Sequence, residues 1–195
     1  ELYAVNLATR ETFKVNEVLA SDADVESFMP ISPARLVYAV RNGSGTLDLY
    51  AVDTVAGGDS VLLSRGSGDD LDIQECAVTP DGSGVVFRAV LQSSGKARLY
   101  VAASNGSLLE ELSIDFPEDV GISRFVVSPA SDGVDFVADG NLYTVPIDGE
   151  TSPLLINAPL FPGAEVEGQF GVGQDGETHI YQADQGDGLH LYAAT

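Results

Sequence analysis

Residues 73–103 read IQECAVTPDGSGVVFRAVLQSSGKARLYVAA, and this stretch decides the fold. The apolar runs in it are 73–78, 85–91 and 98–103. Between them lie TPDG and QSSGK, in which proline presets φ and glycine accepts a positive φ. The pattern predicts three antiparallel strands, and the hairpin signal Asn105-Gly106 predicts a fourth strand at 108–114.

The dipeptide Leu-Tyr marks a repeat along the whole chain. Its copies begin at Leu2, Leu49, Leu99, Leu142 and Leu191, at intervals of 47, 50, 43 and 49 residues. A second apolar marker lies at Val25, Ile73, Ile122 and Val166, at intervals of 48, 49 and 44 residues. A period of 40–50 residues with several strands per unit is typical of a propeller blade. Because two markers share the period, the sequence predicts an all-β chain of four-stranded antiparallel blades, with Leu49, Leu99 and Leu142 at equivalent positions.

The second strands of these units are apolar at successive positions rather than at alternate ones, as in VVFRAVL at 85–91. Neighbouring blades cover both faces of a blade, whereas an open sandwich leaves polar residues at every second position. The pattern therefore favours a β-propeller. The expected division is a partial blade (third and fourth strands) at 1–24, whole blades at 25–72, 73–121 and 122–165, and a partial blade (first three strands) at 166–195.

This division gives about four blades' worth of strands, with one more third-type strand than any other kind. A closed four-blade ring would leave that strand surplus, whereas an arc of a larger ring explains it. We therefore expect an arc that is incomplete as a folding unit and has open edges.

The turn and strand motifs resemble those of TolB-like propeller repeats, which are relatives of the WD-repeat family in bacterial extracytoplasmic proteins. The motifs are Ser32-Pro33 with Val37-Tyr38, Thr79-Pro80-Asp81-Gly82 with Val86-Phe87, and Ser128-Pro129 with Asp135-Phe136. The departures are Pro-Ala-Arg at 33–35, SDG after Pro129 and GVGQDG in the last unit. The resemblance implies a propeller fold and an extracytoplasmic (periplasmic, secreted or cell-surface) location. It implies no ligand, because the motif residues form turns and packing contacts.

The charge is strongly negative, with 30 acidic and 9 basic side chains giving −21. Such a surface repels phosphate backbones and anionic lipid headgroups, so nucleic-acid binding is excluded and a basic protein surface is favoured as a partner. No apolar run is long enough to span a bilayer, so no membrane insertion is expected. A hydrophobic content of 44% argues against disorder despite the charge.

The search for reactive groups predicts no catalytic residue, no metal site and no cofactor. His179 and His190 lack a ligand at metal-binding spacing and are expected to be solvated or satisfied strand residues. Cys76 lies in an apolar run without a neighbouring base, so a buried and unreactive thiol is expected. No nucleophile elbow or phosphate-binding loop is present.

Two acidic loops and two sequons have alternative interpretations. Asp22 with Asp24, and Asp69 and Asp70 with Asp72, could supply oxygens to Ca²⁺, but neither group follows the known loop register, so solvated loops are favoured. The Asn-Gly-Ser sequences at 42–44 and 105–107 fit either tight turns or glycosylation sequons, and the turn is favoured.

These features predict a non-catalytic extracytoplasmic scaffold that binds protein partners or copies of itself. Two alternatives remain: a structural module of a surface or fibre assembly, and the propeller portion of a larger secreted hydrolase. An enzymatic propeller should present inward-facing His, Arg or carboxylate groups from several blades at equivalent positions, and the sequence shows no such recurrence.

Overall fold

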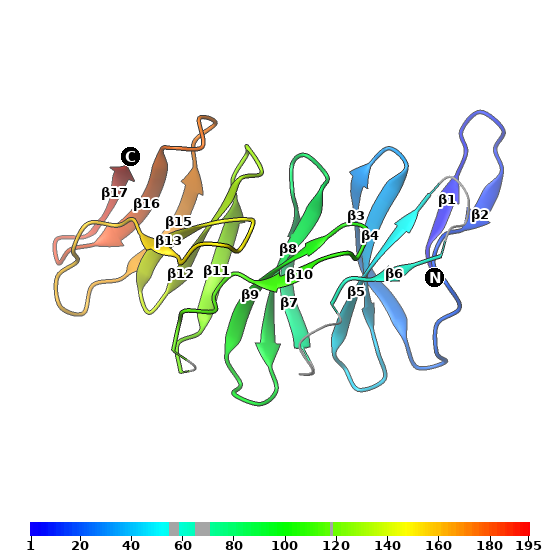
Figure 1. Ribbon diagram of the computed structural model, residues 1–195, viewed down its shortest axis with the longest axis horizontal. Helices are drawn as coiled ribbons and strands as arrows, with labels where there is room; N and C mark the ends of the chain where they lie inside the picture. Colours follow the sequence, from blue (N-terminus) through cyan, green and yellow to red (C-terminus); the bar gives the residue numbers. More distant parts are fainter. Residues whose placement is uncertain (55–58, 65–70, 118) are drawn as a thin grey trace.

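The computed structural model describes residues 1–54, 59–64, 71–117 and 119–195. These residues contain seventeen β-strands in five antiparallel sheets, and no helix long and apolar enough to cross a membrane occurs among them. The sheets lie side by side in an open arc, with the first and the last sheet at opposite ends (Figure 1). The predictions of an all-β chain and of an unclosed propeller arc are therefore confirmed.

In each sheet the strands lie in chain order, so strands consecutive in the sequence are antiparallel neighbours within a sheet. Sheet A holds β1 (Tyr3–Val5) and β2 (Thr12–Lys14). Sheet B holds β3 (Asp24–Ser32), β4 (Arg35–Arg41), β5 (Leu47–Asp53) and β6 (Val61–Leu62). Sheet C holds β7 (Leu71–Val78), β8 (Gly84–Leu91), β9 (Ala97–Ala103) and β10 (Leu109–Glu111). Sheet D holds β11 (Ile122–Val127), β12 (Gly133–Ala138), β13 (Asn141–Pro146) and β14 (Leu154–Leu155). Sheet E holds β15 (Val166–Val172), β16 (His179–Asp184) and β17 (Leu189–Ala194).

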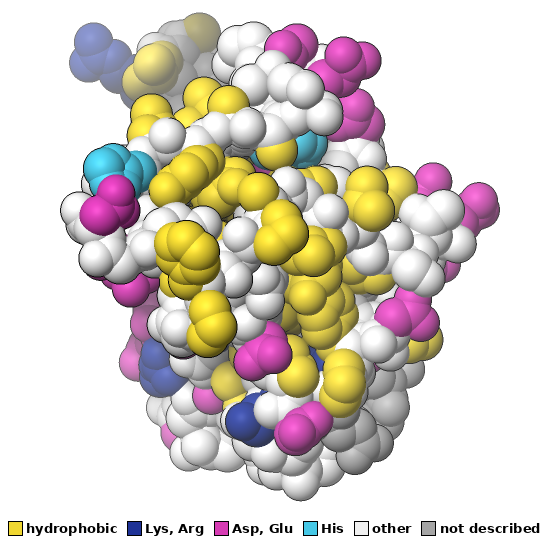
Figure 2. Space-filling view, turned by 90° about the vertical axis from the view of Figure 1, so that its left-hand side faces the viewer, with side chains coloured by type: hydrophobic (Ala, Val, Ile, Leu, Met, Phe, Trp, Pro, Cys, Tyr) yellow, Lys and Arg dark blue, Asp and Glu magenta, His cyan; other side chains and the backbone are white. Residues whose placement is uncertain are grey.

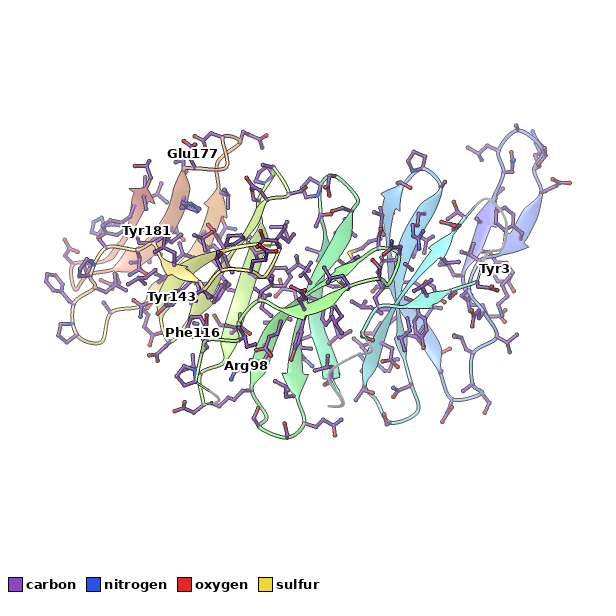
Figure 3. All side chains as sticks on the ribbon, viewed as in Figure 1. Tyr3, Arg98, Phe116, Tyr143, Glu177 and Tyr181 are labelled. Atoms are coloured by element: carbon purple, nitrogen blue, oxygen red, sulfur yellow. The ribbon has the colours of Figure 1, made fainter. Side chains whose placement is uncertain are left out.

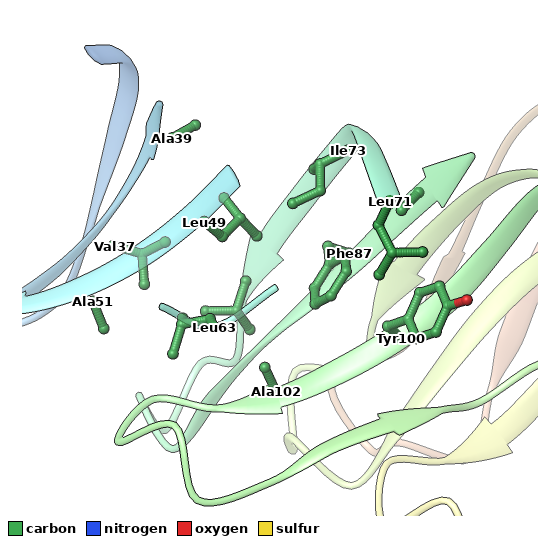
Figure 4. Packing of buried hydrophobic residues seen from close by; sticks show 12 residues of the cluster. Val37, Ala39, Leu49, Ala51, Leu63, Leu71, Ile73, Phe87, Tyr100 and Ala102 are labelled. Carbon is green, nitrogen blue, oxygen red and sulfur yellow. The ribbon is translucent and has the colours of Figure 1, made fainter. Parts of the chain in front are cut away.

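The core lies between the sheets, face against face. Figure 4 shows the contact between sheets B and C, where Leu49 and Leu63 of one sheet meet Ile73 and Phe87 of the other. Both faces of β8 are buried, since Val86 packs toward sheet D while Val85 and Phe87 pack toward sheet B. This two-sided cover explains why the second strands are continuous apolar runs.

An aromatic pair recurs in four of the sheets. In sheet C the ring of Phe87 stacks on that of Tyr100, the tyrosine of the Leu-Tyr marker, with ring centroids 5.4 Å apart. The equivalent pairs are Tyr38–Tyr50, Phe136–Tyr143 and Tyr181–Tyr192. In sheet D the ring of Phe116, which precedes the sheet, adds edge contacts to both members (Figure 3). The marker tyrosines of sheets B, C, D and E therefore act in packing, each against the second strand of its own sheet.

The marker leucines Leu49, Leu99 and Leu142 are equivalent and fully buried, as the repeat predicts. In sheet C the N–H of Leu112 donates to the carbonyl of Leu99 at 2.8 Å, and the N–H of Leu99 donates to the hydroxyl of Ser113 at 3.1 Å. The same two bonds join Leu2 to Val15-Asn16, Leu49 to Leu63-Ser64, and Leu142 to Ile156-Asn157. We call these four apolar–Ser/Asn pairs the closing dipeptides. They explain why β10 is shorter than the expected 108–114, because the chain leaves the regular ladder to make them.

The turns between first and second strands keep one geometry in sheets C and D although their sequences differ. Gly82 has a φ of 73° and donates its N–H to the carbonyl of Thr79 at 2.8 Å. In sheet D the same place is taken by Ser131, with a φ of 62° and a 2.9 Å bond to the carbonyl of Ser128. The sequence departure after Pro129 thus leaves the turn unchanged, because Ser131 adopts the left-handed conformation that usually favours glycine.

Candidate functional site

The first strand of every complete sheet, and of sheet E, carries an irregularity close to the second apolar marker. The pairing register shifts after Val25 in β3, after Ile73 in β7 and after Ile122 in β11, and one residue later, after Glu167, in β15. Such β-bulges place an extra residue outside the ladder and redirect its side chain. The extra residues are Glu26, Gln74 and Ser123 in the three complete sheets, and Gly168 and Gln169 in sheet E.

The residue after each marker is polar and exposed. We call this set the first-strand row: Glu26, Gln74, Ser123 and Glu167. No His, Arg or carboxylate group recurs through this row, because only Glu26 and Glu167 carry carboxylates. The row itself was missed from the sequence, although each apolar marker is followed directly by a polar residue. The common position of Glu26, Gln74 and Ser123 could not be recognised from the sequence, because it depends on the bulges that leave these residues outside the pairing ladder.

Arginines of the neighbouring strands fix parts of this row. The guanidinium of Arg41 binds both carboxylate oxygens of Glu26, with an Nε–Oε2 distance of 2.5 Å and an Nη2–Oε1 distance of 2.9 Å. This hydrogen bonding holds the pKa of Glu26 below its usual range, so the carboxylate stays ionised at neutral pH. Arg88 lies farther from Glu75, which follows the bulge in β7, at 3.6 Å.

Between β11 and β15 the row borders a cavity of about 430 Å³. Arg124 forms one wall, where its Nη2 donates to the carbonyl of Val166 at 2.9 Å and its guanidinium lies 5.3 Å from the ring centroid of Phe170. The carboxylates that border the cavity are Asp139, Glu165 and Glu167. The cavity therefore offers negative charge to a ligand, while its one arginine is engaged with the protein.

A buried acid–histidine pair lies at the interface of sheets D and E. Nδ1 of His179 lies 2.7 Å from Oδ2 of Asp135, whose residue is only 1% exposed. Burial raises the pKa of Asp135, and the hydrogen bond from His179 opposes that shift. The expectation that His179 is a satisfied strand residue is confirmed. Oδ1 of Asp135, the other carboxylate oxygen, is buried without a hydrogen-bond partner among the described residues.

The remaining predicted candidates do not meet in one place. Nε2 of His190 lies 3.2 Å from Asp187 in an exposed pair at the β16–β17 hairpin, so it does have a carboxylate three residues away. Cys76 is partly buried in β7, and burial raises the pKa of its thiol to about 11, which agrees with an unreactive cysteine.

The acidic loops form no shared site among the residues that the structure describes. No group of three or more His, Cys, Asp or Glu side chains that could hold a metal ion is found in that part of the chain. Asp22 and Asp24 lie at the entry to β3, and Asp72 accepts a 2.8 Å bond from the amide of Gln74. Asp69 and Asp70 lie outside the described residues.

Both Asn-Gly-Ser sequences form tight turns. Oδ1 of Asn42 accepts the N–H of Ser44 at 3.1 Å, and Oδ1 of Asn105 accepts the N–H of Ser107 at 2.9 Å. Gly106 has a φ of 74°, a conformation that the hairpin requires and glycine adopts without strain. The turn interpretation is therefore sufficient to explain these sequences.

No protein-family model and no curated protein matches the chain. Among solved structures it is similar to a TolB-like protein from Agrobacterium tumefaciens, with 14% identity and a TM-score of 0.53 over 98% of this chain and 68% of that one. The chain has the fold of a TolB-like β-propeller.

Two enzymes share this propeller fold. One is a puromycin-hydrolyzing peptidase from Mycobacterium tuberculosis, with 14% identity and a TM-score of 0.57 over 89% of this chain. The chain spans 29% of that peptidase. The other is an oligogalacturonate lyase in complex with manganese, with 15% identity and a TM-score of 0.50 over 99% of this chain and 70% of the lyase. At such identities the likeness concerns the fold alone.

Proposed function

We propose that this TolB-like propeller segment is a non-catalytic, extracytoplasmic scaffold that binds a protein partner with a basic surface. The observation that carries the proposal is the first-strand row, in which each of four successive sheets holds an exposed polar side chain directly after its apolar marker. The sheets beneath it are packed apolar layers, so the row is presented on a rigid support.

The charges around the row favour a basic partner. Glu26 and Glu167 belong to the row, Glu75 follows its second member, and Asp139 and Glu165 border the adjoining cavity. Together with a net charge of −21, these carboxylates attract lysine or arginine side chains and increase the rate of association. The extracytoplasmic location rests on the resemblance to TolB-like repeats and on the acidic composition.

Affinity capture with the chain as bait tests the proposal. We expect a basic protein to be recovered, with binding that weakens as salt rises because exposed charges are screened. The double variant Glu165→Lys/Glu167→Lys should lose most of the captured protein. The matched control is Glu177→Lys, on the exposed β15–β16 loop (Figure 3). This loop follows the end of β15 opposite to Glu167, so the variant should bind as the unmodified chain does.

Two results would contradict the proposal. One is capture that is insensitive to salt and equal for both charge variants. The other is hydrolase or lyase turnover by the purified chain that Asp135→Asn or His179→Ala abolishes, since that would make the buried pair catalytic.

A further inference from the structure

A cavity of about 390 Å³ borders the β8–β9 turn of sheet C, where Ser93 and Ser94 form part of its wall. Its volume is within the range of about 300–1,000 Å³ that is typical of small-molecule sites. Two opposite charges lie on the wall: the guanidinium of Arg98, near the start of β9, and the carboxylate of Glu111, at the end of β10. Nε of Arg98 lies 3.8 Å from Oε1 of Glu111, which is too far for a hydrogen bond.

The protein holds both charged side chains in place. The side chain of Arg98 is only 7% exposed, and its Nη1 and Nη2 donate to the carbonyls of Phe116 at 3.3 Å and Pro117 at 2.9 Å (Figure 3). These bonds use two of the five N–H groups of a guanidinium, so donors remain for a ligand. Oε1 of Glu111 accepts the hydroxyl of Ser113, the polar member of a closing dipeptide, at 3.1 Å. The two charges are therefore positioned before any ligand arrives.

The repeat itself does not require this charge pair. Arg98 precedes the marker leucine, and Glu111 precedes the closing dipeptide. The residues at these two places are Asp48 and Leu62 in sheet B, and Asn141 and Leu155 in sheet D. In sheet A they are Glu1 and Lys14, whose charges are in direct contact at 2.7 Å. Sheets B and D thus have no opposite charges there, and only in sheet C do two such charges lie apart on the wall of this cavity.

The rest of the wall has an apolar part. Leu91, Ile114 and Phe116 line it together with the two serine hydroxyls of the turn. Ile114 is 70% exposed, so a bound apolar group that covers it removes hydrophobic surface from water. One space therefore combines a cation, an anion and an apolar surface.

We propose that this cavity binds a free α-amino acid with an apolar side chain. The guanidinium of Arg98 binds the carboxylate of the amino acid, Glu111 binds its ammonium group, and the apolar part of the wall receives its side chain. A ligand with only a carboxylate is disfavoured by Glu111 and by the net charge of −21, and a ligand with only an ammonium group is disfavoured by Arg98. The cavity shares no residue with the first-strand row, so the inference does not depend on the proposed function.

Isothermal titration calorimetry of the chain with L-leucine tests the inference. We expect L-leucine to bind with a Kd at or below about 1 mM. N-acetyl-L-leucine lacks the ammonium group and L-leucinamide lacks the carboxylate, so each should bind about tenfold more weakly or less. Glycine keeps both charges but has no apolar side chain, and it should also bind about tenfold more weakly.

The charge requirement separates this site from unspecific apolar adhesion. Figure 2 shows hydrophobic side chains gathered at the sheet E end of the molecule, where Ile180, Leu189 and Leu191 are exposed. Adhesion there needs neither charge of the ligand, so the two derivatives would bind as well as L-leucine does. The variant Leu191→Ser should leave the Kd for L-leucine unchanged.

On the protein, Glu111→Gln should weaken L-leucine binding about tenfold, because the ammonium group loses its anion. The amide oxygen of glutamine still accepts the hydroxyl of Ser113, so the variant should fold, and its urea midpoint checks this. The matched control is Glu110→Gln, which makes the same change of charge one residue away. The side chain of Glu110 lies on the opposite face of β10, toward Gly149, so L-leucine should bind this variant as it binds the unmodified chain.

Three outcomes would overturn the inference: no binding of L-leucine, equal affinity for L-leucine and either derivative, or equal effects of the two glutamate replacements. The derivatives are tested on the unmodified chain, so the inference is decided even if Glu111→Gln does not fold. If the basic partner is captured while L-leucine does not bind, this inference fails and the proposed function stands. If L-leucine binds while the Glu165→Lys/Glu167→Lys variant leaves capture unchanged, the first-strand row fails and the amino-acid site stands.

Discussion

His179 and Asp135 are 44 residues apart in the chain, yet Nδ1 of the imidazole lies 2.7 Å from Oδ2 of the carboxylate. Asp135 occupies the place that Val37 and Val86 hold in sheets B and C, and His179 the place of Val85. One polar pair thus replaces an apolar contact at the interface of sheets D and E. Its energetic role follows from burial, because each partner removes the cost of leaving the other unpaired.

Replacing one member of this pair should cost more than replacing both. His179→Val leaves Asp135 buried without its partner and should lower the free energy of unfolding by about 3 kcal/mol at pH 7. Asp135→Val/His179→Val restores the apolar contact of the other sheets and should lie within about 1 kcal/mol of the unmodified chain. Urea unfolding of the single and double variants measures both values. Simple additivity of the two single replacements would contradict the coupling.

The stability should also depend on pH through Asp135. Its folded-state pKa is raised by burial, so its contribution to stability is full below the unfolded value of about 4 and is lost as pH rises through the folded value. Asp135→Asn removes this titration, and the variant should show a smaller loss of stability from pH 4 upward than the unmodified chain. Urea midpoints at half-unit pH intervals test this, and parallel profiles for the two proteins would be evidence against it.

The closing dipeptides should stabilise the sheets through their polar member. Ser113→Ala leaves the buried N–H of Leu99 without an acceptor and should lower the free energy of unfolding by about 1–3 kcal/mol. Ser94→Ala, in the exposed β8–β9 turn, is the matched control and should change it by less than about 0.5 kcal/mol. An equal effect of the two replacements in thermal unfolding would show that the bond to Leu99 has no special role.

The β1–β2 hairpin contains a residue that glycine should improve. Arg10 is exposed and has a φ of 62°, a left-handed conformation that costs L-residues about 1–2 kcal/mol. Arg10→Gly relieves this cost, but the greater conformational entropy of glycine in the unfolded chain offsets part of the gain. The net effect should be a rise of about 0.5 kcal/mol in the free energy of unfolding. Arg10→Ala removes the same side chain but keeps the Cβ atom, so a gain of the same size in that control would refute the conformational explanation.

The thiol of Cys76 should react slowly while the chain is folded. With a pKa of about 11, very little thiolate is present at pH 8, and the rate with a disulfide reagent should be on the order of a hundredfold lower than in urea. The rate should increase as pH approaches 11. A folded-state rate equal to that of the unfolded chain would contradict the burial of this side chain.

The sequence by itself determined the all-β class, the repeat and the equivalence of the marker leucines. These features depend on patterns that can be read along the chain. They are proline and glycine in turns, apolar runs of strand length, and a sequence repeat about as long as one four-stranded sheet with its turns. Even the departure at Ser131 left the turn intact, because a local backbone conformation rather than one residue type defines it.

Only the tertiary structure decided where the polar side chains act. Three members of the first-strand row, Glu26, Gln74 and Ser123, reach equivalent exposed places through the bulges after Val25, Ile73 and Ile122, and a pairing register is not visible in one strand's sequence. The contact of Asp135 with His179 joins two sheets, and the exposure of Leu191 depends on which strand lies beside β17. Both features depend on residues that are distant in the sequence. Burial sets the pKa of Asp135 and the accessibility of Leu191, and it exists only once the sheets have packed.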